Sequence, residues 1–389
     1  MPAAPSAYPP DQRLYFLDWL RILAFATLVL FHIGMYYVSW DYHVKSPFAG
    51  PGLVPWMRLT GPWRMSLIFM ISGAATTHML RGGPTLALVR RRSAFLLLPL
   101  LCGMVLVVPP QSYFEVVQKF GYSGSYFEFL RLYFNHYQGF CGNGRCLDLP
   151  TWNHLWFLPY LWVYTLLACF TLAAFPNALH TLSRLVDIVF RGIGLMVIPA
   201  IFLFVVRLTL LQRYPSTHAL WGDWFNHLMY LAMFSLGATF AASRTQWEHM
   251  ASVRWPALLL AISFWAILVF VRPSRPVQHV VVAVYQWAAL VAAFGFARRH
   301  LNRDSFLRAR LTEAVFPVYI LHQTVIIAGS QIMLPLRLAP NLEGPILVVA
   351  TFSLSYLGYE LVKNLNLLRP WFGLRPRSES ITLPASSGV

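Results

Sequence analysis

The stretch that decides the fold is residues 14–37, LYFLDWLRILAFATLVLFHIGMYY. A helix of this length, rising about 1.5 Å per residue, is long enough to cross the roughly 30 Å hydrocarbon core of a bilayer. Asp18 and Arg21 interrupt the start of the apolar run, and no small-residue cleavage site follows it, so the run does not resemble a cleaved signal peptide. We therefore predict a retained first transmembrane helix.

Apolar runs of similar length continue along the chain. Of its 389 residues, 57% are hydrophobic and 11% are charged, and the mean hydropathy is +0.55. A soluble globular domain carries about a quarter charged residues, so this composition excludes a soluble domain. We predict an all-α fold class, a polytopic bundle of about ten transmembrane helices. The predicted spans are 14–37, 62–80, 93–110, 153–175, 193–211, 225–243, 256–272, 278–297, 313–333 and 345–362.

The distribution of basic residues predicts the orientation. The formal net charge is +16, but the arginines fall in short clusters between apolar runs, a pattern that does not indicate nucleic-acid binding. With the N-terminus inside, the inner segments hold 18 Lys and Arg and the outer loops hold 9. The positive-inside rule then predicts cytoplasmic tails at 1–13 and 363–389, a transmembrane domain at 14–362 and a long outer loop at 111–152.

The four cysteines predict one disulfide and no metal site. Cys141 and Cys146 flank a short polar turn in the long outer loop, and no second Cys pair follows at zinc-finger spacing. In an oxidising compartment this pair favours a disulfide. Cys102 and Cys169 lie inside predicted spans, where we expect core residues.

The first span carries three polar side chains on one face. Asp18 and Arg21 are three residues apart, so they can pair. His32 lies eleven residues after Arg21, almost a whole number of turns, which places it on the same face about 16 Å further along. The pair could be an interfacial anchor and the histidine a packed bundle residue. Alternatively, a neutral histidine can take a proton from a hydroxyl and an arginine can hold a phosphate or thioester carbonyl, which is what acyl transfer needs.

Three more polar side chains lie within or beside predicted spans. Arg64 begins the second span, where a snorkelling interfacial arginine is the alternative to a functional one. His154 opens the fourth span, where an aromatic belt explains its surroundings equally well. His322 lies inside the ninth span between apolar residues, and ionisable groups in such places often mark a reactive site.

Two further charged groups lie near the predicted cytoplasmic face. Arg92 ends the cluster Arg90 to Arg92 before the third span, which serves either as a topogenic anchor or as a site for an anionic cofactor phosphate. Glu360 ends the tenth span, where an ion pair with a basic loop is the simpler interpretation.

Taken in order, these motifs resemble the integral-membrane acyltransferase-three family, whose first helix carries an Arg-x10-His pattern. Within that family the likeness is greatest to succinyltransferases for periplasmic glucans. The matching pieces are Arg21 with His32, Tyr15 to Asp18, His43 and Val44, Arg64 and Met65, Phe69 to Gly73, His154 to Leu158, Tyr319 with His322, and Tyr359 with Glu360. The family often shows Arg-x-x-Arg on entering the third helix, and here Phe95 stands in place of the second arginine.

The resemblance implies transfer of an acetyl or succinyl group from cytoplasmic acyl-CoA to a hydroxyl of a cell-envelope saccharide, in a bacterial inner membrane. It implies catalytic roles for His32, Asp18 and Arg21, with His32 as general base or as acyl carrier. It further implies donor binding by Arg21 and Arg92, without a metal. The implied substrate-binding residues are Arg64, His154, His322 and Glu360. A transporter or flippase for an anionic saccharide, or an inactive assembly partner, would also place polar groups in spans.

Overall fold

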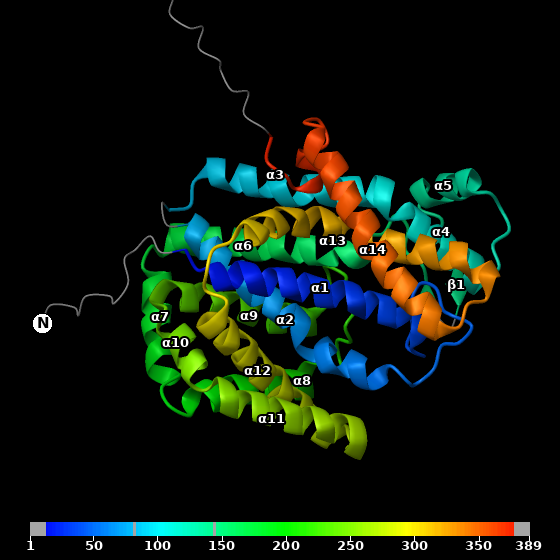
Figure 1. Cartoon of the computed structure of the whole chain (residues 1–389). Helices are drawn as coiled ribbons and strands as arrows, with labels where there is room; N and C mark the ends of the chain where they lie inside the picture. Colours follow the sequence, from blue (N-terminus) through cyan, green and yellow to red (C-terminus); the bar gives the residue numbers. More distant parts are fainter. Residues whose placement is uncertain (1–12, 81–82, 143–144, 377–389) are drawn as a thin grey trace, which may run out of the picture.

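The computed structural model describes residues 13–80, 83–142 and 145–376, and within them the fold is an all-α bundle (Figure 1). The α-helices are α1 (Tyr15–Tyr37), α2 (Val54–Met79), α3 (Leu86–Cys102), α4 (Pro109–Phe120), α5 (Tyr126–Phe134), α6 (Phe157–Ala174), α7 (Ala178–Val189), α8 (Gly194–Leu210), α9 (Trp224–Ser243), α10 (Thr245–Ser252), α11 (Arg254–Ala266), α12 (Arg275–His300), α13 (Phe306–Met333) and α14 (Pro340–Asn364). The shorter elements are η1 (Gly103–Val107), β1 (Cys141–Gly142), β2 (Arg145–Cys146), η2 (Asn153–Trp156), η3 (Ile267–Val271), η4 (Leu334–Leu336) and η5 (Pro370–Phe372).

Each of the ten predicted spans coincides with one of these helices, so the polytopic bundle is confirmed. Among the described residues, six helices are long and apolar enough to cross a membrane, or eight if each of two bent pairs forms one span. One bent pair begins with Leu86–Val107, which is long enough to span by itself, and α4 then turns away by 44°. The remaining two predicted spans are α2 and α9, and the count of ten stays a prediction.

The helices α2 and α9 pack against each other inside the bundle. A Cβ atom built on Gly73 would lie 1.9 Å from the carbonyl oxygen of Phe234, and one built on Gly237 would lie 1.9 Å from that of Met70. Only glycine permits this approach of two backbones, as is common where helices associate in membranes. Because much of each helix faces other helices rather than lipid, both tolerate a more polar composition.

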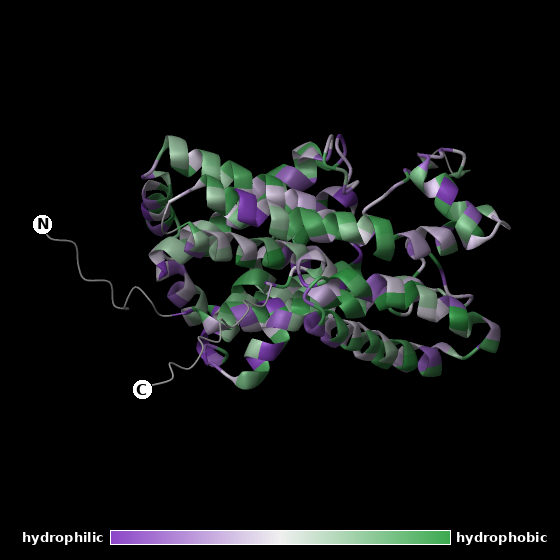
Figure 2. Ribbon diagram, turned by 90° about the horizontal axis from the view of Figure 1, so that it is seen from above, coloured by the Kyte–Doolittle hydropathy of each residue, from purple (hydrophilic) through white to green (hydrophobic). Residues whose placement is uncertain are grey.

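The outside of the bundle is suited to lipid. Large apolar side chains such as Phe170, Ile201 and Leu259 are more than half exposed. Figure 2 shows that long outer stretches of helix are hydrophobic. A bilayer would cover these side chains, so they need no partner protein. Cys102 and Cys169 are buried, as predicted.

Helical segments also occur where the sequence analysis placed loops. At the predicted cytoplasmic end, α7 and α10 connect longer helices, and α7 meets α8 at 107°. At the predicted outer end, α4, α5 and the β1–β2 hairpin form a small cap (Figure 1). The predicted disulfide between Cys141 and Cys146 closes this hairpin. The predicted tail segments 1–12 and 377–389 lie outside the described residues.

Candidate active site

Three of the predicted site histidines meet inside the bundle. His32 on α1 and His322 on α13 are 290 residues apart in the sequence, yet His32 Nδ1 and His322 Nε2 are separated by 2.8 Å. Their rings are stacked, with centroids 5.1 Å apart. His154 on η2 stands perpendicular to His322 at the same centroid distance. The side chains chosen from separate spans therefore form one cluster.

Hydrogen bonding determines which nitrogen carries the proton in each ring. His322 Nδ1 lies 2.6 Å from the carbonyl oxygen of Tyr319, which can only accept, so Nδ1 is the donor. In a neutral His322 the Nε2 atom is then an acceptor and takes the proton of His32 Nδ1. The Nε2 atom of His32 is left with a free lone pair, which is the state that a base or a nucleophile requires.

The His154 ring is held on both sides. Its Nε2 donates to the carbonyl oxygen of Ile320 at 3.0 Å, and its Nδ1 faces the amide of Gln111 at 3.5 Å. The Tyr319 hydroxyl donates to the backbone oxygen of His154 at 2.7 Å. Both ring nitrogens of His154 are thus occupied, which suits a positioning role better than proton abstraction.

A cavity of about 120 Å³ adjoins these rings. Its lining comprises Phe25, Leu28, Phe31, His32, Arg64, Met65, Ile68, His154, Trp156, Phe157, His218 and Tyr319. Arg64 is 5% exposed, and its guanidinium lies 3.8 Å from the centroid of Phe31. In the described residues its Nε has no partner, and the hydrogen bond from its Nη1 to the Thr60 hydroxyl is long at 3.4 Å. A buried cation without a carboxylate partner is costly, so Arg64 is suited to hold an anionic group of a ligand.

The predicted pair Asp18 and Arg21 is present near the start of α1. Arg21 Nη2 lies 3.1 Å from Asp18 Oδ1, and the other carboxylate oxygen contacts Arg13 at 2.8 Å and Arg308 of α13 at 2.5 Å. Asp18 therefore ties α1 to α13 and holds Arg21 in place. Arg21 Nε remains buried and without a partner.

Arg21 and Arg92 line a second cavity, of about 580 Å³, which also contains Glu313, Arg369 and Arg375. Arg369 belongs to the predicted C-terminal tail, whose residues 365–376 fold back onto the bundle. Arg369 donates to the backbone oxygens of Lys363 and Arg375, at 2.8 and 2.6 Å, and lies 3.5 Å from Glu313. The cavity thus has more cations than carboxylates in its wall, as a polyanionic ligand needs.

Phe95, which replaces an arginine of the family motif, is used for packing. Its ring stacks on that of Phe316 of α13 with centroids 5.3 Å apart. The guanidinium of Arg92 also lies over the Phe95 ring, 5.3 Å from its centroid. Arg92 Nε is buried without a partner. Phe95 therefore contacts Arg92 through a cation–π interaction, whereas an arginine here would add a second positive charge.

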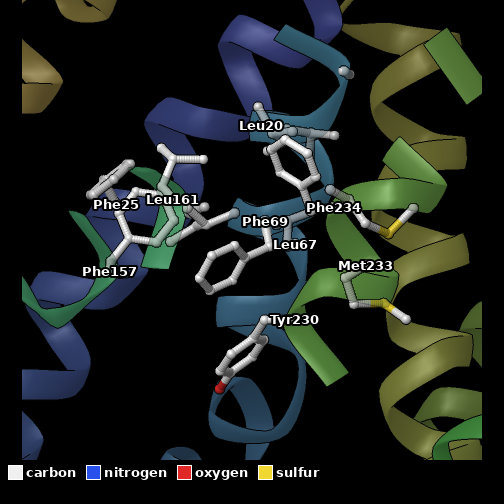
Figure 3. Close-up of a cluster of buried hydrophobic side chains, with 14 of the residues drawn as sticks. Leu20, Phe25, Leu67, Phe69, Phe157, Leu161, Tyr230, Met233 and Phe234 are labelled. Carbon is white, nitrogen blue, oxygen red and sulfur yellow. The ribbon is translucent and has the colours of Figure 1, made fainter. Parts of the chain in front are cut away.

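The two cavities share part of their wall. Phe25 of α1, Ile68 of α2 and Phe157 of α6 line both of them. Figure 3 shows Phe25 close to Phe157 and Leu161, with Phe69 on the neighbouring helix. We call Phe25, Ile68 and Phe157 the septum. The arginine-lined cavity and the cavity at His32 thus have these three apolar side chains in common.

A chain of charged groups lies at the predicted outer end. His43 Nδ1 contacts Glu115 Oε2 at 2.5 Å, Glu115 Oε1 accepts from Lys119 Nζ at 2.9 Å, and Lys119 reaches Asp41 at 2.9 Å. Glu115 lies on α4, beyond the spanning segment Leu86–Val107. Burial alone raises the pKa of Glu115, but His43 and Lys119 lower it to about 2, so Glu115 is a carboxylate at neutral pH.

Glu360 is not brought to either cavity. It pairs with Arg310 at 3.0 Å and with Lys363 at 3.9 Å. Glu313, which sequence reasoning did not single out, is the carboxylate that lines the arginine-rich cavity. Within the described ranges, no group of three or more His, Cys, Asp or Glu side chains is arranged to hold a metal ion.

The chain is similar to known proteins along most of its length. The sequence model of acyltransferase family 3, described as an acyltransferase domain, matches residues 14–360. The chain belongs to this family. It is an integral membrane acyltransferase, and this membership favours an enzyme over the transporter and the inactive partner considered above.

Two similar proteins give the extent of the likeness. The chain is 25% identical over 390 residues to the glucans biosynthesis protein C of Escherichia coli O81 (strain ED1a), covering 94% of this chain and 96% of that protein. The protein of the same name from Escherichia coli (strain K12) is 24% identical over 386 residues, with the same coverage. No solved structure matches the chain.

Several residues of the site were missed by sequence reasoning. Gln111 connects α4 to η2 and α13, because it contacts Asn153 and His154 of η2 and Gln323 and Thr324 of α13. Its position just after a predicted span gave no signal. His43 appeared only as part of the matching motif. A polar residue in an outer loop follows no helical periodicity, so its position in the sequence does not indicate a site.

Proposed function

We propose that the enzyme transfers an acetyl or succinyl group from acyl-CoA at the cytoplasmic face to a hydroxyl of a periplasmic or cell-envelope saccharide. The observation that carries this proposal is the septum, which joins an arginine-lined cavity on one side to the His32 cavity on the other. The positive-inside bias supports a cytoplasmic position for both termini and hence for the arginine-lined cavity. The family likeness supports a bacterial inner membrane.

The donor end of the proposal rests on the arginines. The phosphates of a CoA donor carry several negative charges, and arginine binds phosphate through paired hydrogen bonds. Arg21 and Arg92 both retain an unpartnered Nε in the wall of the cavity. Asp18 keeps Arg21 oriented, and the folded C-terminal segment adds Arg369 and Arg375 to the wall. The thioester end of the donor would then point toward the septum.

The reacting end rests on the tautomer of His32. Its free Nε2 lone pair can attack a thioester carbonyl or take a proton from a hydroxyl, and His322 holds the ring in this state. His154 forms part of the wall of the same cavity and is held there by its hydrogen bonds. Arg64, with no carboxylate partner of its own, is placed to hold an anionic part of a substrate beside His32. The names of the two relatives suggest a glucan as the acceptor saccharide.

The test is acyl transfer in membranes. Radiolabelled acetyl-CoA and succinyl-CoA are supplied together with periplasmic glycans to wild type and to His32→Ala at matched abundance. Label on the glycan from one donor, reduced at least ~100-fold in the variant, supports the proposal. Full transfer by a correctly folded His32→Ala protein would overturn the role of His32. No transfer from either donor in the wild type would overturn the proposed substrates.

A further inference from the structure

His43 and Glu115 form a histidine–carboxylate pair that the proposed reaction has not yet used. Glu115 is an acceptor only, so the short contact to His43 Nδ1 means that this nitrogen carries the proton. The Nε2 atom of a neutral His43 is then a free acceptor, and it has no hydrogen-bond partner within the described part of the chain. Glu115 is 7% exposed and is fixed from its other oxygen by Lys119. A carboxylate that fixes the tautomer of a histidine is the usual arrangement of a general base.

The pair lies on the predicted outer side of His32, next to Tyr42, and neither member belongs to the lining of the reaction cavity. The Tyr42 ring contacts both histidines: it is stacked on His32 with centroids 6.4 Å apart, and it is tilted by 59° against His43 with centroids 5.1 Å apart. The side chain of His43 is 20% exposed, so water or a hydroxylated molecule from outside can reach it.

The neighbouring histidines do not have this free nitrogen. His322 uses Nδ1 toward Tyr319 and Nε2 toward His32, and His154 is bonded on both sides. His218 is stacked on Trp156, and no carboxylate contacts its ring in the described residues. Among these histidines of the described residues, His32 and His43 are therefore the two whose tautomer is fixed with Nε2 free.

We propose that His43 is the base that takes the proton from the acceptor hydroxyl, that Glu115 is its positioning residue, and that His32 carries the acyl group. This inference rests on the proposed function and separates the two possible roles of His32. The reaction then has two halves. In the first, His32 accepts the acyl group from the donor, and in the second, His43 takes the proton of the acceptor hydroxyl.

In the first half, His32 Nε2 attacks the thioester carbonyl carbon. A C–N bond forms and the C–S bond breaks, so the sulfur leaves with the bonding electrons as a thiolate and takes a proton from water. The acylated ring of His32 carries one positive charge, and its Nδ1 proton remains shared with His322 Nε2.

In the second half, the acceptor oxygen attacks the acyl carbon while its proton moves to His43 Nε2. The new C–O bond forms and the C–N bond breaks, so the electron pair returns to His32 Nε2 and the ring is neutral again. The positive charge now lies on His43, beside the carboxylate of Glu115, and the proton leaves to outer water. Charge and atoms balance in both halves.

The experiment measures the two halves separately in purified protein. Without acceptor, thiol release from acyl-CoA and label retained on the protein report the first half. Addition of glycan then reports the second. The variants are His43→Gln and Glu115→Gln, and His136→Gln is the matched control because His136 is an exposed histidine of the same outer cap.

We expect both test variants to keep the stoichiometric thiol release and the labelled protein. Transfer of the label to glycan should be at least ~100-fold slower in His43→Gln and ~10-fold slower in Glu115→Gln. His136→Gln should match the wild type. The retained first half shows that a variant is folded. Normal transfer to glycan by His43→Gln overturns the proposal. The proposal also fails if both test variants are folded and yet lose both thiol release and transfer to glycan. Absence of labelled wild-type protein, with normal overall transfer, also overturns it while leaving the proposed function intact.

Discussion

At the scale of single residues, the position of one proton on His322 decides what His32 can do. The Tyr319 carbonyl fixes this proton on Nδ1, and the free lone pair of His32 follows from it. The helical spacing of Asp18, Arg21 and His32 was readable because all three lie on one helix. The contact between His32 and His322 was not, because it joins positions 290 residues apart and depends on how α1 packs on α13.

Replacement of His322 tests this dependence. His322→Leu removes the acceptor for His32 Nδ1, and we expect kcat to fall by about 10–100-fold with little change in KM for the donor. His322→Gln keeps an oxygen acceptor of similar reach and should recover part of the rate. Steady-state kinetics in detergent, with thermal unfolding as a check on folding, measures both. Equal loss in the two variants would contradict the tautomer argument.

Arg64 should distinguish the two candidate acyl groups. Succinyl carries a free carboxylate and acetyl does not, and a charge-assisted hydrogen bond contributes about 1.5–3 kcal/mol. We expect Arg64→Met to lower the ratio of succinyl to acetyl transfer by about 10–100-fold. Arg207→Met is the control, because Arg207 is also a bundle arginine but donates to Gln286 at 2.6 Å. An unchanged ratio would instead associate Arg64 with the acceptor.

At the scale of elements, the close approach of α2 and α9 holds the middle of the bundle together. The sequence predicted both helices, because any backbone in lipid must satisfy its own hydrogen bonds. It did not predict their contact, since apolar residues facing lipid and facing another helix look alike. The helices α7 and α10 were missed for a related reason, because short amphipathic segments do not give a long apolar run.

Substitution at Gly73 tests the helix contact. A side chain there would collide with the backbone of Phe234, which cannot move without displacing α9. We expect Gly73→Val to destabilise the protein by at least about 2 kcal/mol, seen as a lower unfolding temperature in detergent. Gly52→Val is the matched control, because a Cβ at Gly52 meets nothing within 4 Å. Equal stability of the two variants would argue against the close packing.

At the scale of the whole molecule, the arrangement is two cavities that share the wall formed by Phe25, Ile68 and Phe157. Sequence reasoning placed Arg21 and Arg92 toward one side and Arg64 and His154 toward the other, and the two groups line separate cavities. His322, predicted inside a span, contacts His32 instead. The contribution of Arg369 was not predictable, because the tail reads as a polar segment and its fold depends on tertiary contacts with Lys363 and Glu313.

The predicted orientation is testable by labelling. The native free cysteines are buried, so a new surface cysteine can be followed with a membrane-impermeant maleimide. We expect Ser123→Cys, on the outer cap, to be labelled in intact spheroplasts. We expect Arg299→Cys, at the end of α12, to be labelled only after permeabilisation. The reverse pattern would invert the topology and place the arginine-lined cavity outside.

The measurement that tests the central claim most directly is sided transfer in sealed inside-out vesicles, with labelled acyl-CoA added outside and glycan enclosed within. Transfer across the septum predicts that the enclosed glycan becomes labelled in wild type and not with His32→Ala. Label on glycan only when donor and glycan share one side of the membrane would contradict a path from the arginine-lined cavity through Phe25, Ile68 and Phe157 to His32.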